Sequence, residues 1–197
     1  MPKPLAVAIT GGIGAGKSEA LRAFERHGAA VISSDEIVHR LLSENETMRR
    51  ALLERFGEGI LDDSGRLDRG AIAEVVFADR EALEWLEALL HPLVVREYLS
   101  WRDELGRLEH PPAVCATEVP LLYEVGGEKR FDAVVAITAP RELRSSRASV
   151  PLEARERRLI PDEEKVKRAD FAYVNDGTTA DLDAFVARVM KQLEERA

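Results

Sequence analysis

A glycine-rich stretch near the start of the chain carries the residue types that bind polyphosphates. It fits the pattern G-x-x-x-x-G-K-[ST] and consists of Gly11, Gly12, Ile13, Gly14, Ala15, Gly16, Lys17 and Ser18. Glycines let a loop wrap closely around an anion, so that successive backbone N–H groups point toward the phosphates. Lys17 would supply a positive charge for the β- and γ-phosphates, and the Ser18 hydroxyl could hold Mg²⁺. The pattern therefore predicts a site for the polyphosphate of a nucleotide.

The residues on either side of this loop have the patterns of a strand and a helix. Residues 5–10 are apolar and partly β-branched, as in a buried strand, and residues 19–27 show helical spacing that ends at Gly28. A helix that begins near Gly16 would direct the positive end of its dipole at the same anion. This context favours a phosphate site over a glycine-rich turn without a ligand. The dinucleotide pattern G-x-G-x-x-G fits less well, because Lys17 stands where its third glycine belongs.

Two acidic residues follow further predicted strands, at the ends where open α/β sheets place their chemistry. Residues 29–33 are expected to form a second strand, and Asp35 follows it. An aspartate there could accept a proton from an acceptor hydroxyl, and it could also be only the cap of the next helix. Residues 113–117 are expected to form a third strand, followed by Glu118. Glu118 could hold Mg²⁺, as a carboxylate does in many P-loop enzymes, or be an ordinary strand-end charge.

A basic stretch stands out within an acidic chain. Residues 141–168 hold nine Lys or Arg side chains and six Asp or Glu side chains, whereas the whole chain has a net charge of -8. The planar arginine fork grips phosphate with two hydrogen bonds, and a mobile arginine stabilises charge on a transferring phosphoryl group. The alternative is a solvated helix pair held by Glu–Arg spacing. We expect at least one of these cations to reach phosphate.

The remaining pattern completes a sheet and predicts a long helical insertion. Residues 131–139 and 172–175 are expected to be the fourth and fifth strands, and residues 181–196 a closing amphipathic helix. Residues 44–110 keep a spacing of three or four between apolar residues and are too long for a single crossover helix. They are predicted to form an insertion that covers the acceptor side of the site.

Three local signals subdivide that insertion. Asp62-Asp63-Ser64-Gly65 has the composition of a turn, and Asp68 or a neighbour is expected to start a helix. His91-Pro92 predicts a break between two helices, because proline disfavours a helical residue before it.

The composition fits one globular domain and disfavours one class of partner. The chain has 197 residues, of which 45% are hydrophobic and 32% charged, enough for a sizeable core. Its acidity disfavours duplex nucleic acid as a partner. Cys115 is the only cysteine, which rules out an internal disulfide and favours a reducing cytoplasm. We expect no membrane span and no signal peptide, small-molecule substrates, and a monomer or weak homo-oligomer.

Several stretches together identify a family resemblance. They are residues 9–18, Ser34-Asp35-Glu36-Ile37, Gly65-Arg66-Leu67-Asp68-Arg69, Leu86-Glu87, His91-Pro92, Val119-Pro120-Leu121-Leu122-Tyr123-Glu124, Glu164-Lys165, Ala169-Asp170 and Asn175-Asp176-Gly177. Over nearly its whole length the chain thereby resembles the dephospho-CoA kinase family. The glycine loop is common to many NTPases, whereas the Val-Pro-Leu-Leu-Tyr-Glu and Gly-Arg-Leu-Asp-Arg stretches are far more distinctive of this family.

The resemblance implies an activity and assigns roles to residues. Members of the family transfer the γ-phosphate of ATP to the 3′-hydroxyl of the ribose in dephospho-CoA, with Mg²⁺, in the last step of coenzyme A synthesis. Asp35 matches the aspartate proposed to activate that hydroxyl. Lys17 and Ser18 match the family's phosphate and magnesium contacts. Arg144 and Arg147 are the candidates for the catalytic arginine of a lid, although Leu159 stands where the lid commonly has a glutamine.

The implied fold is that of nucleoside monophosphate kinases. It is an α/β P-loop NTPase core with a five-stranded parallel sheet flanked by helices, a helical acceptor-binding insertion and a basic lid. Residues 1–197 would form a single P-loop kinase domain. Its core would comprise residues 1–43, 111–140 and 169–197, with the insertion at 44–110 and the lid at 141–168.

Two other functions share the glycine loop. A kinase for another nucleotide, nucleoside or sugar is disfavoured only by the family-distinctive stretches. A GTP-binding switch would usually carry a guanine-reading Asn-Lys-x-Asp stretch after a strand, and the sequence has no such stretch.

Overall fold

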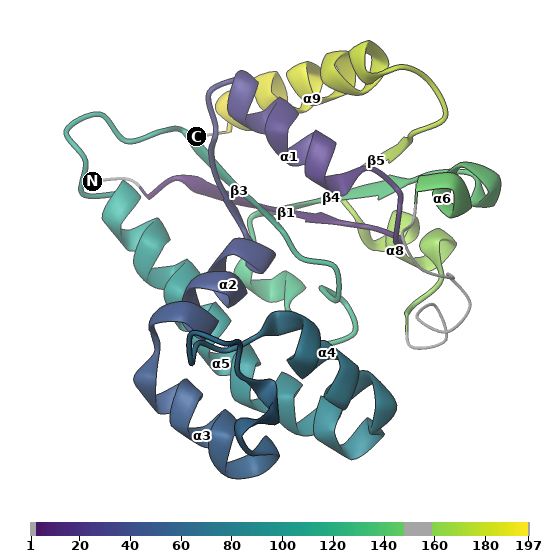
Figure 1. The fold of residues 1–197 in the computed structure, drawn as a ribbon. Helices are drawn as coiled ribbons and strands as arrows, with labels where there is room; N and C mark the ends of the chain where they lie inside the picture. The colour runs from purple at the N-terminus through teal and green to yellow at the C-terminus, as the bar shows by residue number, and fades with distance from the viewer. Residues whose placement is uncertain (1–2, 148–158, 197) are drawn as a thin grey trace. The chain divides into compact units, whose positions relative to one another are not determined.

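A five-stranded parallel sheet forms the centre of the first of two compact units, the sheet-containing unit, which comprises Met1–Ser33 and Arg102–Ala197 (Figure 1). The computed structural model describes residues 3–147 and 159–196. The strands are β1 (Leu5–Thr10), β2 (Ala30–Ser33), β3 (Val114–Glu118), β4 (Ala133–Thr138) and β5 (Phe171–Val174). They lie in the order β2-β3-β1-β4-β5, with all neighbours parallel. This arrangement confirms the predicted sheet, and it brings the carboxyl ends of the strands to one edge, where the site residues follow them.

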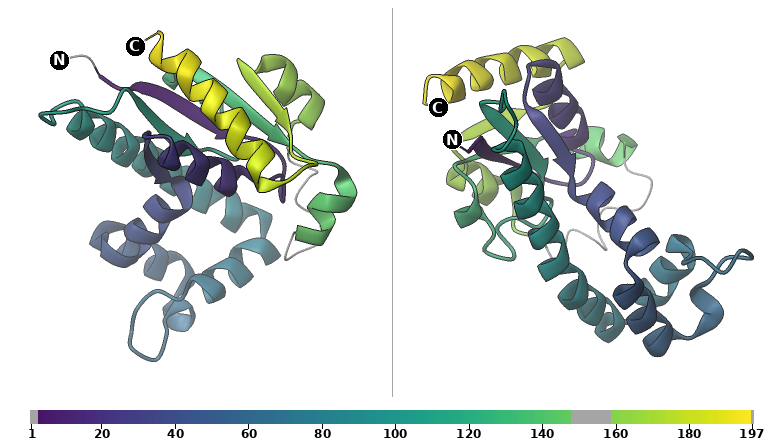
Figure 2. Two further views of the ribbon diagram at one scale, coloured as in Figure 1. Left: turned by 90° about the horizontal axis from the view of Figure 1, so that it is seen from above. Right: turned by 90° about the vertical axis from the view of Figure 1, so that its left-hand side faces the viewer.

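Helices cover one face of this sheet. α1 (Lys17–Arg26) and α9 (Thr179–Glu194) pack against each other and against β3, and the left view of Figure 2 shows α9 lying across the strands. Their apolar side chains share one buried cluster with the strands, including Phe24, Ile9 and Val186. The capping box of Thr178 and Asp181 fixes the start of α9.

The opposite face is covered by segments that follow β3 and β4. Leu122 and Tyr123 pack against Ala8 and Val134, with Ile160 partly buried beside them. The nearby elements on the chain are η2 (Glu128–Arg130), α6 (Arg141–Arg147) and α8 (Asp162–Arg168), of which α8 contacts β4. Because both faces are covered, all six residues of β4 are buried, which explains its continuous apolar sequence.

A second compact unit spans Ser34–Trp101 and is helical. It contains α2 (Ser34–Glu44), α3 (Glu46–Phe56), η1 (Glu58–Ile60), α4 (Arg69–Ala78) and most of α5 (Arg80–Leu105). Asp68 caps α4 by accepting the backbone N–H groups of Gly70 and Ala71, in line with the sequence signal. Among the described helices of the chain, none has the length and apolarity needed to cross a bilayer.

α5 runs unbroken through Pro92, so the predicted break at His91-Pro92 is wrong. A proline inside a helix removes one backbone hydrogen bond and costs about 3 kcal/mol. Contacts on both sides of it offset this cost. Trp85 meets Phe56 of α3 edge to face, with ring centroids 5.4 Å apart, and Tyr98 is buried on the other side of the proline.

Candidate active site

The predicted phosphate loop, residues 11–18, connects β1 to α1 and folds back on itself. The buried Lys17 lies across the loop, and its Nζ donates to the carbonyl oxygen of Gly12 at 3.0 Å. The backbone N–H of Ala15 donates to the same oxygen at 3.3 Å. Gly16 is the residue that caps the start of α1, so the free N–H groups of the first helical turn open toward the loop. This is the geometry of an anion site at a helix N-terminus.

Three of the predicted site residues meet at the end of the loop: Lys17 and Ser18 from the loop itself, and Glu118 from β3. The Ser18 hydroxyl donates to Oε2 of Glu118 at 2.9 Å, and Oε1 of Glu118 lies 3.7 Å from Lys17 Nζ. Burial lowers the pKa of Lys17, and the nearby Glu118 carboxylate opposes this shift. The structure thus brings together the lysine expected to bind phosphate and both residues expected to hold Mg²⁺.

The Ser18–Glu118 pair suits Mg²⁺ chemically. This ion prefers oxygen ligands and binds through one or two protein side chains, with phosphate and water oxygens completing its octahedron. In the described part of the chain, no group of three or more His, Cys, Asp or Glu side chains is gathered to hold a metal. A hydroxyl and a carboxylate that are already in contact are the small donor set that a nucleotide-bound Mg²⁺ requires.

Of the two candidate lid arginines, Arg144 lies against the phosphate loop. A Cβ atom at Gly12 would lie 2.7 Å from Arg144 Nη1 and 2.9 Å from Asp162 Oδ2, so the bare glycine is what lets both charges approach. Arg144 Nε donates to the carbonyl oxygen of Ala139 at 3.2 Å, and Nη1 lies 3.9 Å from Asp162. Arg147 is exposed at the end of α6. Three further arginines of the basic stretch, Arg155, Arg157 and Arg158, lie outside the described residues.

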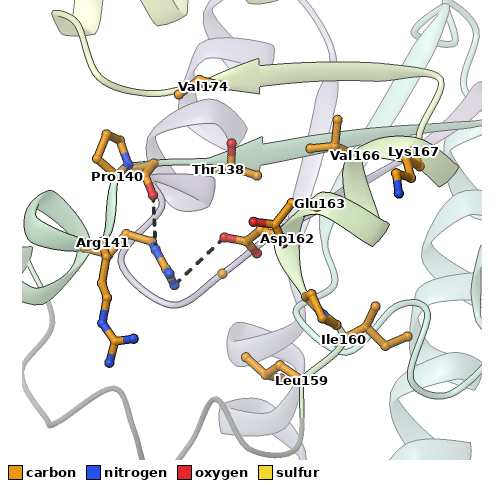
Figure 3. Close-up of a pocket in the computed structure, with 14 residues that line it drawn as sticks. Thr138, Pro140, Arg141, Leu159, Ile160, Asp162, Glu163, Val166, Lys167 and Val174 are labelled. Carbon is orange, nitrogen blue, oxygen red and sulfur yellow. Dashed lines mark hydrogen bonds and ion pairs between the residues drawn. The ribbon is translucent and has the colours of Figure 1, made fainter.

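A pocket of about 820 Å³ adjoins the loop at Gly12 (Figure 3). The ends of β4 and β5, α6, and the start of α8 surround it. Its apolar lining includes Pro140, Ile160 and Val174, and Asp162 lies at its loop side. The volume falls in the range of sites that bury a small organic ligand.

Asp35 belongs to the other compact unit. It is exposed in the first turn of α2, two residues after the end of β2. One turn further, on the same face of α2, Nδ1 of His39 lies 3.3 Å from Nη1 of Arg69 at the start of α4. Arg69 ends the Gly-Arg-Leu-Asp-Arg stretch, so that stretch contributes a cation close to the helix that carries Asp35. The catalytic role of Asp35 stays a prediction.

Comparison with known proteins decides among kinases that share such a loop. The model of the dephospho-CoA kinase family matches residues 5–181. The chain belongs to the dephospho-CoA kinase family. It is 37% identical to the dephospho-CoA kinase of Methylococcus capsulatus, over 92% of this chain and 93% of that one. It is 36% identical to the enzyme of Thermus thermophilus, over 96% and 92%.

Solved structures agree with this assignment. A crystal structure from Thermus thermophilus, 37% identical, superposes with a TM-score of 0.77 and covers 98% of this chain and 99% of that one. The dephospho-CoA kinase from Campylobacter jejuni, 28% identical, gives a TM-score of 0.69 with 98% of each chain covered. A shikimate kinase from Aquifex aeolicus, 15% identical with a TM-score of 0.52, shares the fold alone. The predicted family, the P-loop kinase fold and the nature of the protein as a kinase are confirmed.

The sequence assigned no role to two residues that lie beside the phosphate loop, although one of them, Asn175, belongs to a stretch that carries the family resemblance. Asp162 faces Gly12 from α8, as described above. Asn175 follows β5 and donates from its side-chain amide to the carbonyl oxygen of Ala15 at 2.9 Å. A polar residue directly after a strand was a usable signal for Asn175, since it is the same signal that pointed to Glu118. No local sequence pattern indicated that Asp162 would lie close to Gly12.

Proposed function

We propose that this protein transfers the γ-phosphate of ATP to the 3′-hydroxyl of the ribose of dephospho-CoA, giving coenzyme A and ADP. The observation that carries the proposal is the phosphate loop, with Lys17 lying across it and the Ser18–Glu118 pair beside it. Membership of the dephospho-CoA kinase family supports the choice of acceptor. The substrates are thus two small molecules, and we expect the protein to act in the cytoplasm as a monomer or weak homo-oligomer.

The triphosphate of ATP would lie against the backbone N–H groups of residues 11–18. Lys17 would exchange its contact with the Gly12 carbonyl for the β- and γ-phosphate oxygens. Because burial penalises its charge in the bare protein, a bound polyanion would raise the pKa of Lys17 again. Arg144 would add a second cation over Gly12, and the adjoining pocket would receive the nucleoside part of ATP.

Ser18 and Glu118 would hold Mg²⁺ through their side-chain oxygens. When bound, the ion would neutralise charge on the β- and γ-phosphates. The protein's own part is to keep the two oxygens together. Ser18 lies in the first turn of α1, after the loop that follows β1, and Glu118 ends β3, which is the neighbour of β1 in the sheet. Transfer of a phosphoryl group depends mainly on such positioning and charge neutralisation.

Asp35 would act on the acceptor. Its carboxylate would accept the proton of the ribose 3′-hydroxyl as that oxygen bonds to the γ-phosphorus and the bond to the ADP oxygen breaks. A lid formed by residues 141–168 would close over the site and exclude water, since water would otherwise take the place of the acceptor and hydrolyse ATP.

A coupled ADP-release assay tests the proposal. The full chain would be supplied with Mg²⁺ and ATP and offered dephospho-CoA, AMP or adenosine as acceptor, with Lys17→Ala as the inactive control. Of the three acceptors, only dephospho-CoA should give rapid ADP release. Mass spectrometry should show that the product has gained one phosphate on the ribose. Faster turnover of AMP or adenosine would assign a different acceptor, and thermal stabilisation by GTP without ATP would point to a switch.

A further inference from the structure

We propose that Asn175 is a positioning residue that fixes the phosphate loop in its anion-binding conformation. This inference rests on the proposed role of the loop in binding ATP. Asn175 Nδ2 donates to the carbonyl oxygen of Ala15 at 2.9 Å, across 160 positions of sequence. Both groups are shielded from water, because Asn175 is 7% exposed and Ala15 is 0% exposed. A hydrogen bond between buried groups is costly to lose, since neither partner can turn to solvent instead.

The hydrogen bond sets the direction of a loop N–H group. The carbonyl of Ala15 and the N–H of Gly16 belong to one planar trans peptide, in which the two groups point in opposite directions. When Asn175 holds the carbonyl, the N–H of Gly16 must point away from Asn175. Gly16 adopts a φ of 99°, and a glycine reaches positive and negative φ with similar ease. The Ala15–Gly16 peptide would therefore flip readily if nothing held it.

The side chain of Asn175 also fills the space that glycine leaves. A Cβ atom at Gly16 would lie 2.3 Å from Asn175 Nδ2, which is closer than such atoms approach. Glycine at this position and asparagine after β5 are thus fitted to each other. Asn175 is itself held, because its backbone N–H donates to the Thr138 carbonyl oxygen at the end of β4 at 2.7 Å. The amide that restrains the loop is consequently anchored to the rigid sheet.

This arrangement predicts a specific defect. If Asn175 acts through the loop, its loss should weaken binding of the polyphosphate and leave recognition of the acceptor unchanged. It should also let the loop peptide move without unfolding the protein. Loss of a residue that only supported the fold would instead lower thermal stability. In the protein that stayed folded, binding of ATP and of the acceptor would then change to the same extent.

The first experiment uses Asn175→Asp and Asn175→Ser, with Asp176→Asn as a matched control at the exposed neighbouring position. Binding of ATP, inorganic tripolyphosphate and adenosine would be measured by calorimetry, and KM for dephospho-CoA by the coupled assay. We expect Asn175→Asp to weaken both polyphosphates by at least about tenfold, corresponding to one lost hydrogen bond. Adenosine affinity and the acceptor KM should stay within about twofold of the wild type. Asp176→Asn should match the wild type.

A pH series supplies a readout that a merely structural role would not move. The carboxyl group that Asn175→Asp introduces cannot donate to the Ala15 carbonyl when it is ionised, whereas its protonated form can. Burial at this position raises the pKa of the introduced carboxyl above its ordinary value of about 3.9. The ratio of variant to wild-type dissociation constants for tripolyphosphate should therefore shrink as the pH is lowered from about 8 to about 5.5. Amide exchange of Gly16, followed by NMR, should be faster in the variants than in the wild type.

The outcomes separate this inference from the proposed function. Unchanged polyphosphate affinity in Asn175→Asp would overturn the positioning role while leaving the kinase proposal intact. If Asn175→Asp does not fold, the milder Asn175→Ser decides: equal losses for ATP, adenosine and the acceptor would overturn the inference. Failure of the wild-type protein to bind ATP or to phosphorylate dephospho-CoA would refute the proposed function, and the inference with it.

Discussion

At the scale of single residues, the charged side chains of the site already contact groups similar to those that the substrate would offer them. Lys17 donates to a loop carbonyl and lies near Glu118, and burial lowers its pKa. A triphosphate would offer it far more negative charge than these partners do. Residues that touch the polyphosphate should therefore affect nucleotide affinity and turnover together, whereas a base that touches only the acceptor should affect turnover alone.

Asp35→Ala provides the sharpest test of this distinction. We expect it to lower kcat by about 10²- to 10⁴-fold, the usual contribution of general base catalysis, because no other carboxylate is assigned to the acceptor hydroxyl. ATP affinity should change little. Lys17→Ala, in contrast, should weaken both ATP binding and turnover. The control is Glu36→Ala, at the next exposed position of α2. Wild-type turnover in Asp35→Ala would refute the base role.

The two lid arginines should differ in their effect. Arg144 lies over Gly12, whereas Arg147 is exposed at the end of α6. We expect Arg144→Ala to lower kcat/KM for ATP by about 10- to 100-fold, consistent with the loss of a charge-assisted contact to phosphate. Arg147→Ala, on the same helix, is its matched comparison and should have a smaller effect. The reverse order in steady-state kinetics would assign the phosphate contact to Arg147.

How far the sequence predicts the site depends on how local each signal is. The phosphate loop is a continuous motif, so its residues and its place between β1 and α1 were predictable. Glu118 was predictable from a simple rule, because strand ends of a parallel sheet share one edge. The contact of Asp162 with Gly12 was not predictable, since it depends on how α8 packs after the intervening lid residues. The choice between Arg144 and Arg147 likewise needed the orientation of a short helix.

At the scale of elements, the strong periodicity of apolar residues predicted the strands and helices. The exception is the predicted break at Pro92, where packing keeps the helix continuous. All five expected strands are present, the first at the expected residues and the others with ends shifted by at most two residues. The rule that proline ends a helix failed at Pro92, because the contact of Trp85 with Phe56 and the burial of Leu86 and Tyr98 hold both halves of α5. Local propensity is a weak preference, which tertiary contacts can outweigh.

A buried ion pair holds α8 to the core, and the stability of the protein should depend on it. Lys165 is completely buried, and its Nζ lies 2.9 Å from Oε1 of Glu124. Lys165→Met would leave the carboxylate without its partner, and breaking such a pair costs about 3 to 5 kcal/mol of unfolding free energy. Because two apolar residues can replace a buried pair at little cost, Lys165→Met combined with Glu124→Leu should recover most of the stability.

Chemical denaturation measures these changes. Arg80→Ala is the matched control, because Arg80 forms an exposed pair with Glu84 at 2.7 Å, and exposed pairs contribute little. Equal stability of Lys165→Met and the wild type would show that the pair does not anchor α8.

At the scale of the whole molecule, hydrogen-bonded carboxylates govern how stability responds to acid. In the sheet-containing unit, the Thr178 hydroxyl lowers the pKa of Asp181, and the Arg26 guanidinium lowers that of Asp183. In the helical unit, hydrogen bonds from the Ser64 hydroxyl and the Arg66 backbone lower the pKa of Asp62 to about 2. Both compact units thus contain carboxylates that bind a proton less readily when folded than when unfolded.

The sign of the pH dependence follows from linkage. A carboxylate with a lowered pKa in the folded state contributes its full stabilisation above its ordinary pKa of 3.8 and loses it as the pH falls toward the folded value. We therefore expect the free energy of unfolding to change little between about pH 8 and pH 5 and to fall steadily below about pH 4. Urea denaturation across this range measures it. Asp62→Asn should be less acid-sensitive than the wild type between about pH 4 and pH 2, since it removes one such group. A stability that rises on acidification would contradict the argument, because it would require the folded chain to bind more protons than the unfolded one.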